Sequence, residues 1–329
     1  MQNSHSKTGL VVLFNHNHEK NIPLIKHLYN ERFSEMKILM PFYYGSDKDV
    51  IDVFGNSFVF HTYIAQAREK IMTMNCDDFL IIGDDLLLNP DLNELNFHQK
   101  LNIPHGAFYI DNVEDISTGD YYRPLIEATK FTTTPPGLDS SAARLLPSYE
   151  NAFTILHDKG LMNSSILSKC TPFYQPWIKP FSANLYKNYK IFKGRVWHFL
   201  NYLKWKFRPK KASYPCVFGY SDIILIPRDR MEELCHYLEI MATWQMFVEL
   251  AIPTSISLLK NAHVVYSNSI PYKTGNVWYP QNPNHFKNIN EKINQLSDKC
   301  KGEINNLTEH FPNEYLYLHP VKLSQFNKK

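Results

Sequence analysis

Two adjacent aspartates, Asp84 and Asp85, stand between apolar runs in the segment FLIIGDDLLLNPDL, residues 79–92. Buried carboxylates lose their hydration and repel each other unless a positive group lies beside them. A divalent cation such as Mg²⁺ or Mn²⁺ supplies that charge, because it binds one or two carboxylates and fills its other positions with water and phosphate oxygens. The pair therefore predicts a metal site that receives a phosphate-bearing ligand. A solvated turn is the structural alternative.

The two carboxylates are expected to have different roles. Side chains along an extended chain point to opposite sides, so both cannot face one ion equally well. We expect Asp85 to bind the metal directly. Asp84 is expected to assist at the metal site by orienting a hydroxyl of the ligand or a water molecule beside the metal.

A largely parallel sheet covered by helices is expected to position this pair. Apolar runs predict strands at residues 9–15, 36–44, 57–61, 78–88, 105–113 and 216–227. Helical spacing predicts helices at 22–33, at 62–75 with Thr62 as N-cap, at 228–261 with a break at Pro253, and at about 287–309. In such α/β sheets ligands bind beyond the carboxyl ends of the strands. This rule places on one rim Asn15, Asp47, Asp84 and Asp85.

The segment CDDFLIIGDDLLLNPDL, residues 76–92, resembles the metal-binding aspartate motif of GT-A glycosyltransferases. That motif consists of two adjacent acids, or of two acids separated by one residue, after a hydrophobic strand. A hydrophobic run and Asn-Pro often follow it. The order of elements is also similar: a nucleotide-binding half, the motif, an acceptor half and a late histidine. Gly83 stands where many members have their first aspartate. The resemblance implies a GT-A-like (Rossmann-like) α/β fold and transfer of a sugar from a nucleotide-diphosphate sugar.

Two residues of the C-terminal segment YLYLHPVKLS gain roles from this resemblance. A histidine near the C-terminus often supplies a further metal ligand in GT-A enzymes, which implies that role for His319. Lys322 would neutralise the diphosphate as a point charge. A tail strand docked into the core, with a hydrogen-bonded histidine, is the structural alternative.

Four residues of the first half would contact the nucleotide. The resemblance implies that Asn15 and His16 lie near the base or ribose, that Asp47 accepts from the imide of a uracil base, and that Arg68 reaches the nucleotide. Each has a structural alternative. Asn15 and His16 can form a polar turn, Asp47 can be a surface acid, and Arg68 can pair with a neighbouring acid.

The acceptor half has to supply a general base if transfer inverts the configuration of the sugar. Two acids in apolar surroundings are candidates, Asp222 in FGYSDIILIP and Glu249 in WQMFVELAIP. Burial raises the pKa of a carboxylate, which suits a base and equally suits a buried hydrogen-bond acceptor. The sequence leaves open which acid is the base and whether transfer inverts or retains.

A basic amphipathic segment occupies residues 190–211. No acid occurs between Asp158 and Asp222, and apolar residues within the segment fall at helical spacing: Phe192, Val196, Phe199, Leu200, Leu203 and Phe207. A basic helix with aromatic residues is typical of a helix lying on a membrane surface. A helix covering its own core and a nucleic-acid groove are alternatives, and no nucleic-acid partner is expected.

The composition agrees with an ordinary globular protein. The 329 residues, 44% of them hydrophobic, allow a large core, and the net charge of +3 is too small to indicate a nucleic-acid partner. Five widely spaced cysteines without a CxxC pair suggest reduced thiols in a cytosolic protein. No apolar run approaches the roughly 20 residues of a membrane span. We expect a cytoplasmic protein that is peripheral on the inner face of the membrane.

These observations predict one catalytic domain with three parts. Residues 1–128 would form the nucleotide-sugar half, 129–215 a loop-rich insertion, and 216–329 the acceptor half with a tail that closes the site. The expected function is Mn²⁺- or Mg²⁺-dependent transfer of a sugar, from a UDP-sugar by preference, to a glycan or glycolipid acceptor in bacterial surface polysaccharide or lipopolysaccharide synthesis. A non-catalytic membrane-peripheral scaffold and a metal-dependent phosphoester hydrolase are the alternatives.

Overall fold

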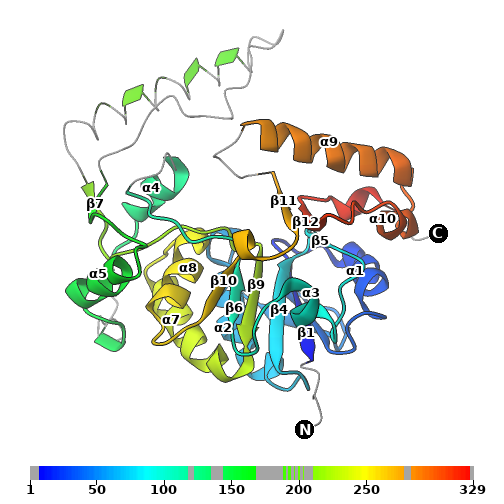
Figure 1. The fold of residues 1–329 in the computed structure, drawn as a ribbon, viewed down its shortest axis with the longest axis horizontal. Coiled ribbons are helices and arrows are strands. Elements are labelled where there is room, and N and C mark those ends of the chain that lie inside the picture. The colour runs from blue at the N-terminus through cyan, green and yellow to red at the C-terminus, as the bar shows by residue number, and fades with distance from the viewer. Residues whose placement is uncertain are drawn as a thin grey trace.

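A seven-stranded sheet with the order β10-β6-β9-β4-β1-β2-β3 forms the centre of the fold (Figure 1). The computed structural model describes residues 7–117, 122–134, 144–167, 188–189, 192–193, 196, 199–200, 203, 210–277 and 283–326. The strands of this sheet are β1 (Thr8–Leu13), β2 (Met36–Pro41), β3 (Val50–Val53), β4 (Asp78–Gly83), β6 (Phe108–Ile110), β9 (Ile223–Pro227) and β10 (Val264–Tyr266). β9 runs antiparallel to both neighbours, and the other neighbouring strands pair in parallel. The predicted α/β class, with a mixed and mainly parallel sheet flanked by helices, is confirmed.

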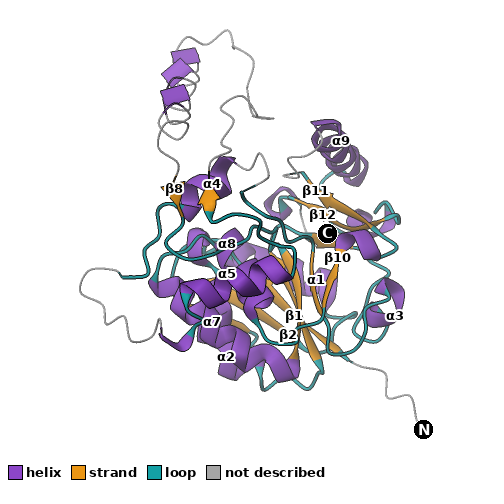
Figure 2. Cartoon of the chain, turned by 60° about the vertical axis from the view of Figure 1, so that its left-hand side comes forward, coloured by secondary structure: helices purple, strands orange, loops and turns teal. Residues whose placement is uncertain are grey.

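Helices cover both faces of this sheet, as its apolar strands require. β1 is buried along its whole length and β4 along nearly all of it, which is the pattern of strands packed on two sides. One face packs against α2 (His61–Ile71), α7 (Met231–Thr243) and α8 (Val248–Leu258), which Figure 2 shows gathered along one side of the strands. The core of the other face includes residues of α1 (Ile22–Tyr29), α3 (Phe97–Leu101), α9 (Pro283–Cys300) and α10 (Asn305–Glu309).

A three-stranded sheet stands beyond the carboxyl end of β4 (Figure 1). It consists of β11 (Lys273–Asn276), β12 (Tyr315–His319) and β5 (Leu87–Leu88), with β12 in the middle. β12 pairs parallel with β11 and antiparallel with β5, where Leu318 is opposite Leu87. The C-terminal segment is therefore a docked strand, and its last residue, His319, comes to the turn that follows β4.

The remaining described elements are short. They are α4 (Tyr122–Ala128), α5 (Tyr149–Asp158), the antiparallel pair β7 (Ile166–Leu167) and β8 (Lys210–Lys211), and 3₁₀ turns at Glu19–Asn21, Ser57–Val59, Arg228–Arg230, Ser267–Ser269 and Leu323–Gln325. α5 is fixed to α8 where the Lys159 ammonium donates to the carbonyl of Ser257 at 2.6 Å. Strands from before residue 128 and after residue 216 share one sheet, so the two outer parts of the predicted domain fold together.

The strand predicted at 57–61 is wrong. Ser57–Val59 is a 3₁₀ turn that begins where the Asn56 side chain accepts from the Phe58 amide, and α2 follows it. The aromatic residues that suggested a strand serve helix packing instead, since the Phe58 ring lies 5.0 Å from that of Phe247. The third strand of the sheet is β3, a segment of four residues that the turn signal at Gly45-Ser46-Asp47 obscured.

Several predicted boundaries also shift. α2 begins at His61 with Phe60 as its N-cap residue, so Thr62 lies inside the helix. β9 begins at Ile223, so Asp222 precedes the strand instead of lying within it. The polar helix predicted near the C-terminus is two helices, α9 and α10.

The predicted helix break at Pro253 is wrong, and its correction explains a neighbouring contact. The break falls between α7 and α8, at residues 244–247, and Pro253 lies inside α8. A proline removes the amide that would bind the carbonyl four residues earlier, here that of Glu249. The amide of Gly219 binds this carbonyl instead, at 3.0 Å. A side chain at Gly219 would meet the Asn112 carbonyl at 2.2 Å, so only glycine fits this approach.

Candidate active site

The aspartate pair lies at a switch point of the sheet. β1 is flanked by β2 on one side and by β4 on the other, so the loops after β1 and β4 leave the sheet in different directions. Ligands of open α/β sheets bind in the crevice that such a divergence creates. Here the Asp84 amide donates to the Leu13 carbonyl at 2.8 Å, and the Asn15 amide donates to the Asp84 carboxylate at 3.4 Å. The predicted position of Asn15 beside the pair is thereby confirmed.

His319 joins the pair from the last strand. Its Nε2 lies 3.2 Å from Oδ1 of Asp85, and its Nδ1 lies 3.7 Å from Oδ2 of Asp222. The ring is 6% exposed, whereas the two carboxylate side chains keep 32% and 22% of their exposure. A buried imidazole therefore lies between two carboxylates that face the opening of the site.

Asp222 reaches this rim because β9 runs antiparallel to β4. The residue before an antiparallel strand lies at the edge where its parallel neighbours end, and the Asp222 carbonyl accepts from the Gly83 amide at 3.0 Å. Its carboxylate also accepts from the Asn276 side chain at 3.5 Å, at the end of β11. Acids from both halves of the chain, Asp85 and Asp222, thus meet on one rim, on either side of His319.

The close spacing of the carboxyl groups in the cluster shifts their pKa values in different directions. Burial raises the pKa of Asp84 to about 7, and the adjacent Asp85 carboxylate adds to the effect. Burial raises the pKa of Asp222 as well, again with a contribution from Asp85. For Asp85 itself, burial would raise the pKa, but the hydrogen bond and charge of His319 outweigh it and lower the value.

The pKa of His319 is raised, whereas that of its partner Asp85 is lowered. Burial would lower its pKa, but the carboxylates around it, led by Asp222 and Asp85, raise the value to about 9. The ring is therefore a buried cation among these carboxylates. Lys322 follows it three residues later, and its charge also lowers the pKa of Asp85. Both predicted C-terminal residues, His319 and Lys322, come to the aspartate pair.

Asp111 is a further member of this region that the sequence analysis missed. It follows β6, is 4% exposed, and accepts hydrogen bonds from the hydroxyls of Tyr109, at 2.8 Å, and Tyr317. Burial raises the pKa of Asp111 to about 7 against these two hydrogen bonds, and the Asp222 charge adds to the rise. The signal was present, because Asp111 directly follows the apolar run FYI of the segment predicted as a strand, much as the aspartate pair follows the apolar run FLII.

The donor set suits a hard divalent cation that keeps much of its own coordination shell. Asp85, Asp222 and His319 offer two carboxylates and an imidazole. The His319 Nδ1 is buried and has no hydrogen-bond partner among the described residues. In the described part of the chain these three residues do not bring their ligand atoms within 4.8 Å of one another. A cation here would take one or two protein ligands and leave the other positions to water and phosphate oxygens, as Mg²⁺ does.

The other residues predicted to contact the nucleotide lie outside this cluster. Asp47 is six residues beyond β2 and forms an ion pair with Lys26 of α1 at 2.7 Å. Arg68 lies near the end of α2, 3.9 Å from the acid of Glu69, and its charge acts on the thiol of Cys235 in α7. For Arg68 this ion pair is the structural alternative given above, whereas Asp47, for which the alternative was a surface acid, is a partly exposed acid paired with a lysine. His16 is exposed in the loop after β1.

Glu249, the other candidate base, lies in α8. It is half-buried in the first turn of α8, and its carbonyl accepts from Gly219, three residues before Asp222. Asp222 itself faces His319 directly. The structure thus brings Asp222 to the rim, and it connects Glu249 to the segment before Asp222 through the backbone only.

The basic segment 190–211 is described at few positions. Four of its apolar side chains are exposed: Phe192 (59%), Val196 (41%), Phe199 (46%) and Leu200 (58%). They do not cover a core of the described residues, which was the structural alternative for this segment. Within the described residues no helix combines the length and apolar character that crossing a membrane requires.

The cysteines show no role at the rim. Cys76, Cys216, Cys235 and Cys300 are free and buried, and Cys170 lies outside the described residues. Burial raises the pKa of the Cys216 thiol to about 12, as expected of an unreactive core residue.

No family model matches the chain, and no curated protein is significantly similar to it.

Proposed function

We propose that this protein is a metal-dependent glycosyltransferase of the GT-A type that uses a nucleotide-diphosphate sugar. The observation that carries the proposal is the contact between Asp85 and His319, at 3.2 Å, on the carboxyl rim of a mainly parallel sheet. The resemblance of the aspartate motif implied that these two residues bind one metal, although they lie far apart in the sequence. Their convergence supports that reading over a solvated turn.

The site has the charge pattern that a nucleoside diphosphate and its metal require. Buried acids exceed buried cations, so a divalent ion relieves the repulsion between Asp84 and Asp85. The bound Mn²⁺ or Mg²⁺ would stabilise negative charge on the departing diphosphate. Lys322, exposed beside Asp85, would contact the diphosphate from the solvent side.

The acceptor side of the reaction falls to Asp222 and Glu249. In an inverting transfer one of them would accept the proton of the acceptor hydroxyl while the sugar–phosphate bond breaks. Asp222 has the raised pKa of a buried carboxyl next to other acids. Asp222→Asn and Glu249→Gln show which acid is the base. The variant that lacks the base loses transfer activity yet still binds the donor nucleotide.

We also propose that the protein acts at a membrane surface, on the cytoplasmic side, where a glycan or glycolipid acceptor is found. The exposed apolar side chains of Phe192, Phe199 and Leu200 support this, because they stand within a segment of lysines and arginines without acids. Basic residues near an anionic surface contribute about 1 kcal/mol each to membrane binding.

The test of the transferase is thermal stability against a panel of nucleoside diphosphates and nucleotide sugars, each with Mn²⁺ or with chelator. A donor that binds the folded state raises the melting temperature, and the rise must require metal. Asp85→Asn should abolish the metal-dependent rise, while the matched control Asp158→Asn, at an exposed acid of α5, should keep it. The best ligand then enters a transfer assay with glycan and lipid acceptors.

Three outcomes would redirect the proposal. No shift with any nucleotide would favour a non-catalytic scaffold with this fold. A shift with phosphate esters, together with phosphate release in the absence of an acceptor, would favour a phosphoester hydrolase. A metal-dependent shift that persists in Asp85→Asn would move the metal away from the rim.

A further inference from the structure

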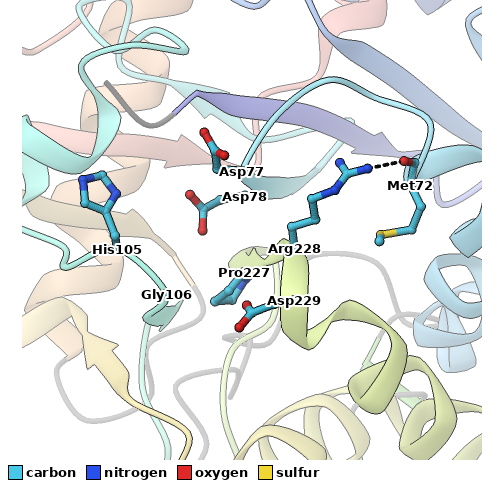
Figure 3. A pocket seen from close by; sticks show the side chains of 8 residues that line it. All are labelled: Met72, Asp77, Asp78, His105, Gly106, Pro227, Arg228 and Asp229. Carbon is cyan, nitrogen blue, oxygen red and sulfur yellow. Dashed lines mark hydrogen bonds between the residues drawn. The ribbon is translucent and has the colours of Figure 1, made fainter. Parts of the chain in front are cut away.

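A second cluster of ligand-type side chains lies at the opposite edge of the sheet. Asp78 is the first residue of β4 and Gly83 the last, so about 17 Å of extended chain separates this cluster from the aspartate pair. A pocket of 710 Å³ opens beside it, lined in part by Asp77, Asp78 and His105 (Figure 3). This edge is distinct from the site proposed above.

The pocket has an acidic character. Asp77, Asp78 and Asp229 contribute carboxylates to its wall. The guanidinium of Arg228 is also in the wall, but its donors are occupied by backbone carbonyls, those of Met72, Met74 (2.7 Å) and Cys76 (3.1 Å). Carboxylates therefore outnumber the one arginine in the wall of this pocket.

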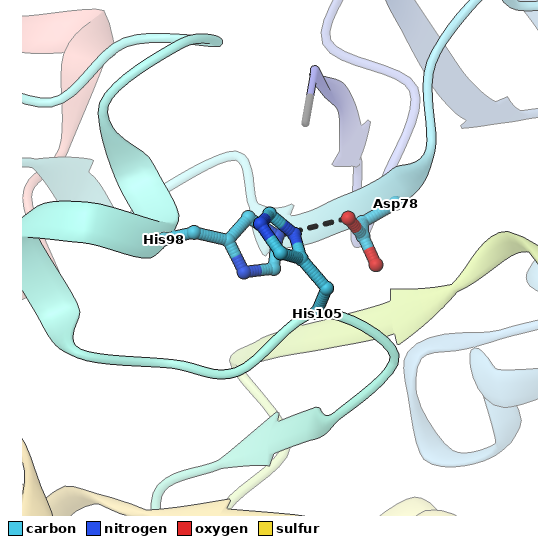
Figure 4. A group of neighbouring side chains, drawn as sticks. All are labelled: Asp78, His98 and His105. Carbon is cyan, nitrogen blue, oxygen red and sulfur yellow. Dashed lines mark hydrogen bonds and ion pairs between the residues drawn. The ribbon is translucent and has the colours of Figure 1, made fainter. Parts of the chain in front are cut away.

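Three side chains from three different segments converge beside this pocket (Figure 4), and two of them, Asp78 and His105, belong to its wall. Asp78 comes from β4, His98 from α3, and His105 from the loop that leads into β6. One ligand atom from each lies within 4.8 Å of the other two. Asp78 and His98 are buried, whereas His105 is exposed, so the cluster has a fixed inner part and an accessible outer ligand.

The ring of His98 is held as metal-binding histidines are held. Its Nδ1 lies 3.0 Å from the carbonyl of Ile103, and a carbonyl can only accept, so Nδ1 carries the hydrogen. Nε2 points to Oδ2 of Asp78 at 2.8 Å. A backbone carbonyl that fixes one nitrogen, and so presents the other to a cation, is the usual support of a histidine ligand.

An ion pair between Asp78 and a protonated His98 accounts for part of this arrangement. It does not account for His105, whose ring lies 4.8 Å from that of His98, at an interplanar angle of 36°. Two imidazoles and a carboxylate in mutual reach are the donors of His- and carboxylate-bound zinc. The rim near Asp85, by contrast, is dominated by oxygen donors.

We propose that Asp78, His98 and His105 form a binding site for a transition-metal cation of the Zn²⁺ class. Three protein ligands leave a fourth position open to the pocket, where water or a ligand group completes the tetrahedron. The bound ion ties the start of β4 to α3 and to the loop before β6. β6 ends next to Asp111, so the bound ion also fixes the start of the strand that leads to the rim.

The test measures zinc content in the full-length chain after chelator treatment and dialysis against Zn²⁺. All variants carry Asp85→Asn as well, so that a metal ion bound at the rim does not contribute to the measured zinc content. In that background we expect one Zn²⁺ per chain, and we expect none after His105→Asn, because losing a direct ligand costs more than the roughly 10- to 100-fold that loss of a supporting hydrogen bond costs. His157→Asn, at an exposed histidine of α5, is the matched control and should keep the ion.

A spectroscopic measurement keeps the proposal testable whatever the stability of the variants. Co²⁺ in place of Zn²⁺ should give the intense visible absorption of a tetrahedral site, and His105→Asn should abolish it. His105 is exposed, so this substitution leaves the core intact. Zinc retained by His105→Asn at the level of His157→Asn would overturn the proposal. So would an Asp85→Asn background that holds no zinc.

Discussion

The imidazole of His319 lies 3.2 Å from the carboxylate of Asp85, although one residue ends the last strand of the chain and the other follows β4. The contact depends on β12 inserting between β11 and β5, and the amide of Val321 donates to the Asp85 carbonyl at 2.6 Å as a further connection. The backbone therefore sets the spacing of the two side chains, and a substitution at either one leaves the strand in place.

His319→Gln should weaken metal-dependent nucleotide binding without unfolding the protein. The substitution removes the buried imidazole between Asp85 and Asp222, and we expect a loss of at least about 10- to 100-fold in apparent Mn²⁺ affinity. Titration of Mn²⁺ at saturating nucleotide measures it. His27→Gln, on the exposed part of α1, is the control, and equal Mn²⁺ affinities in the two variants would remove His319 from the site.

Asp111→Ala should destabilise the protein whether or not metal is present. It leaves the buried hydroxyls of Tyr109 and Tyr317 without their acceptor, which costs about 1–3 kcal/mol for each unsatisfied group. Urea unfolding measures the loss. Tyr317→Phe removes only one hydroxyl and should cost clearly less, so a larger loss in Tyr317→Phe than in Asp111→Ala would contradict this account.

Replacement of His61 should reduce the acid sensitivity of the fold. Burial lowers the pKa of His61 from 6.5 to about 3, and neither ring nitrogen has a partner among the described residues. The unfolded chain binds this proton below pH 6.5 and the folded chain does not, so stability falls as the pH drops through that window. Between pH 7 and pH 5 the contribution is about 2 kcal/mol.

Urea unfolding at pH 7 and pH 5 tests this value. His61→Leu should lose about 2 kcal/mol less than the wild type on acidification, whatever its absolute stability. The exposed His157→Leu should behave as the wild type does. The same pH dependence in all three proteins would show that His61 is not responsible.

Arg228→Lys should lower stability more than the same exchange at Arg230. The Arg228 guanidinium donates to three backbone carbonyls after α2. The single ammonium of a lysine cannot reproduce the planar arrangement of these donors. We expect a loss of about 1–3 kcal/mol in urea unfolding. Arg230 contacts Glu233 and the Lys260 carbonyl at the surface, so its exchange should have little effect. Equal losses would refute the special role of Arg228.

Binding to anionic lipid vesicles should depend on the exposed apolar residues of the 190–211 segment. Phe199→Gln combined with Leu200→Gln removes two side chains, each worth roughly 1.5–3 kcal/mol when buried in an apolar phase. Co-sedimentation with phosphatidylglycerol vesicles should fall at least about tenfold. Ile166→Gln, an exposed apolar residue of β7, is the control, and unchanged sedimentation of the double variant would refute the membrane role.

The parts of the fold that could be predicted are those with strong local signals. The apolar runs around β1, β4 and β9 identified strands because they are buried on both faces, and the strand-end rule then placed Asn15 and Asp84 together. The predicted strand at 57–61 failed because Phe58 and Phe60 face helices, and β3 was missed because four residues give a weak signal.

The parts that could not be predicted depend on contacts between distant segments. Pro253 is compatible with α8 because the Gly219 amide supplies the missing donor, and nothing near Pro253 in the sequence indicates that partner. Asp111 became part of the candidate site through Tyr317, more than two hundred residues later. The pairing of His98 with Asp78 depends in the same way on how α3 folds back to the start of β4.

The position of β12 has a consequence for how this protein matures. The large sheet is complete by Tyr266, the end of β10, whereas the histidine of the rim arrives with the strand at Tyr315–His319. A nascent chain, or one clipped before β12, would hold all seven strands of the core and its acids yet lack the imidazole between them. Because Leu316, Tyr317 and Leu318 are buried in the core of one sheet face, the docking of β12 completes the packing of that face and the arrangement of the rim in the same step.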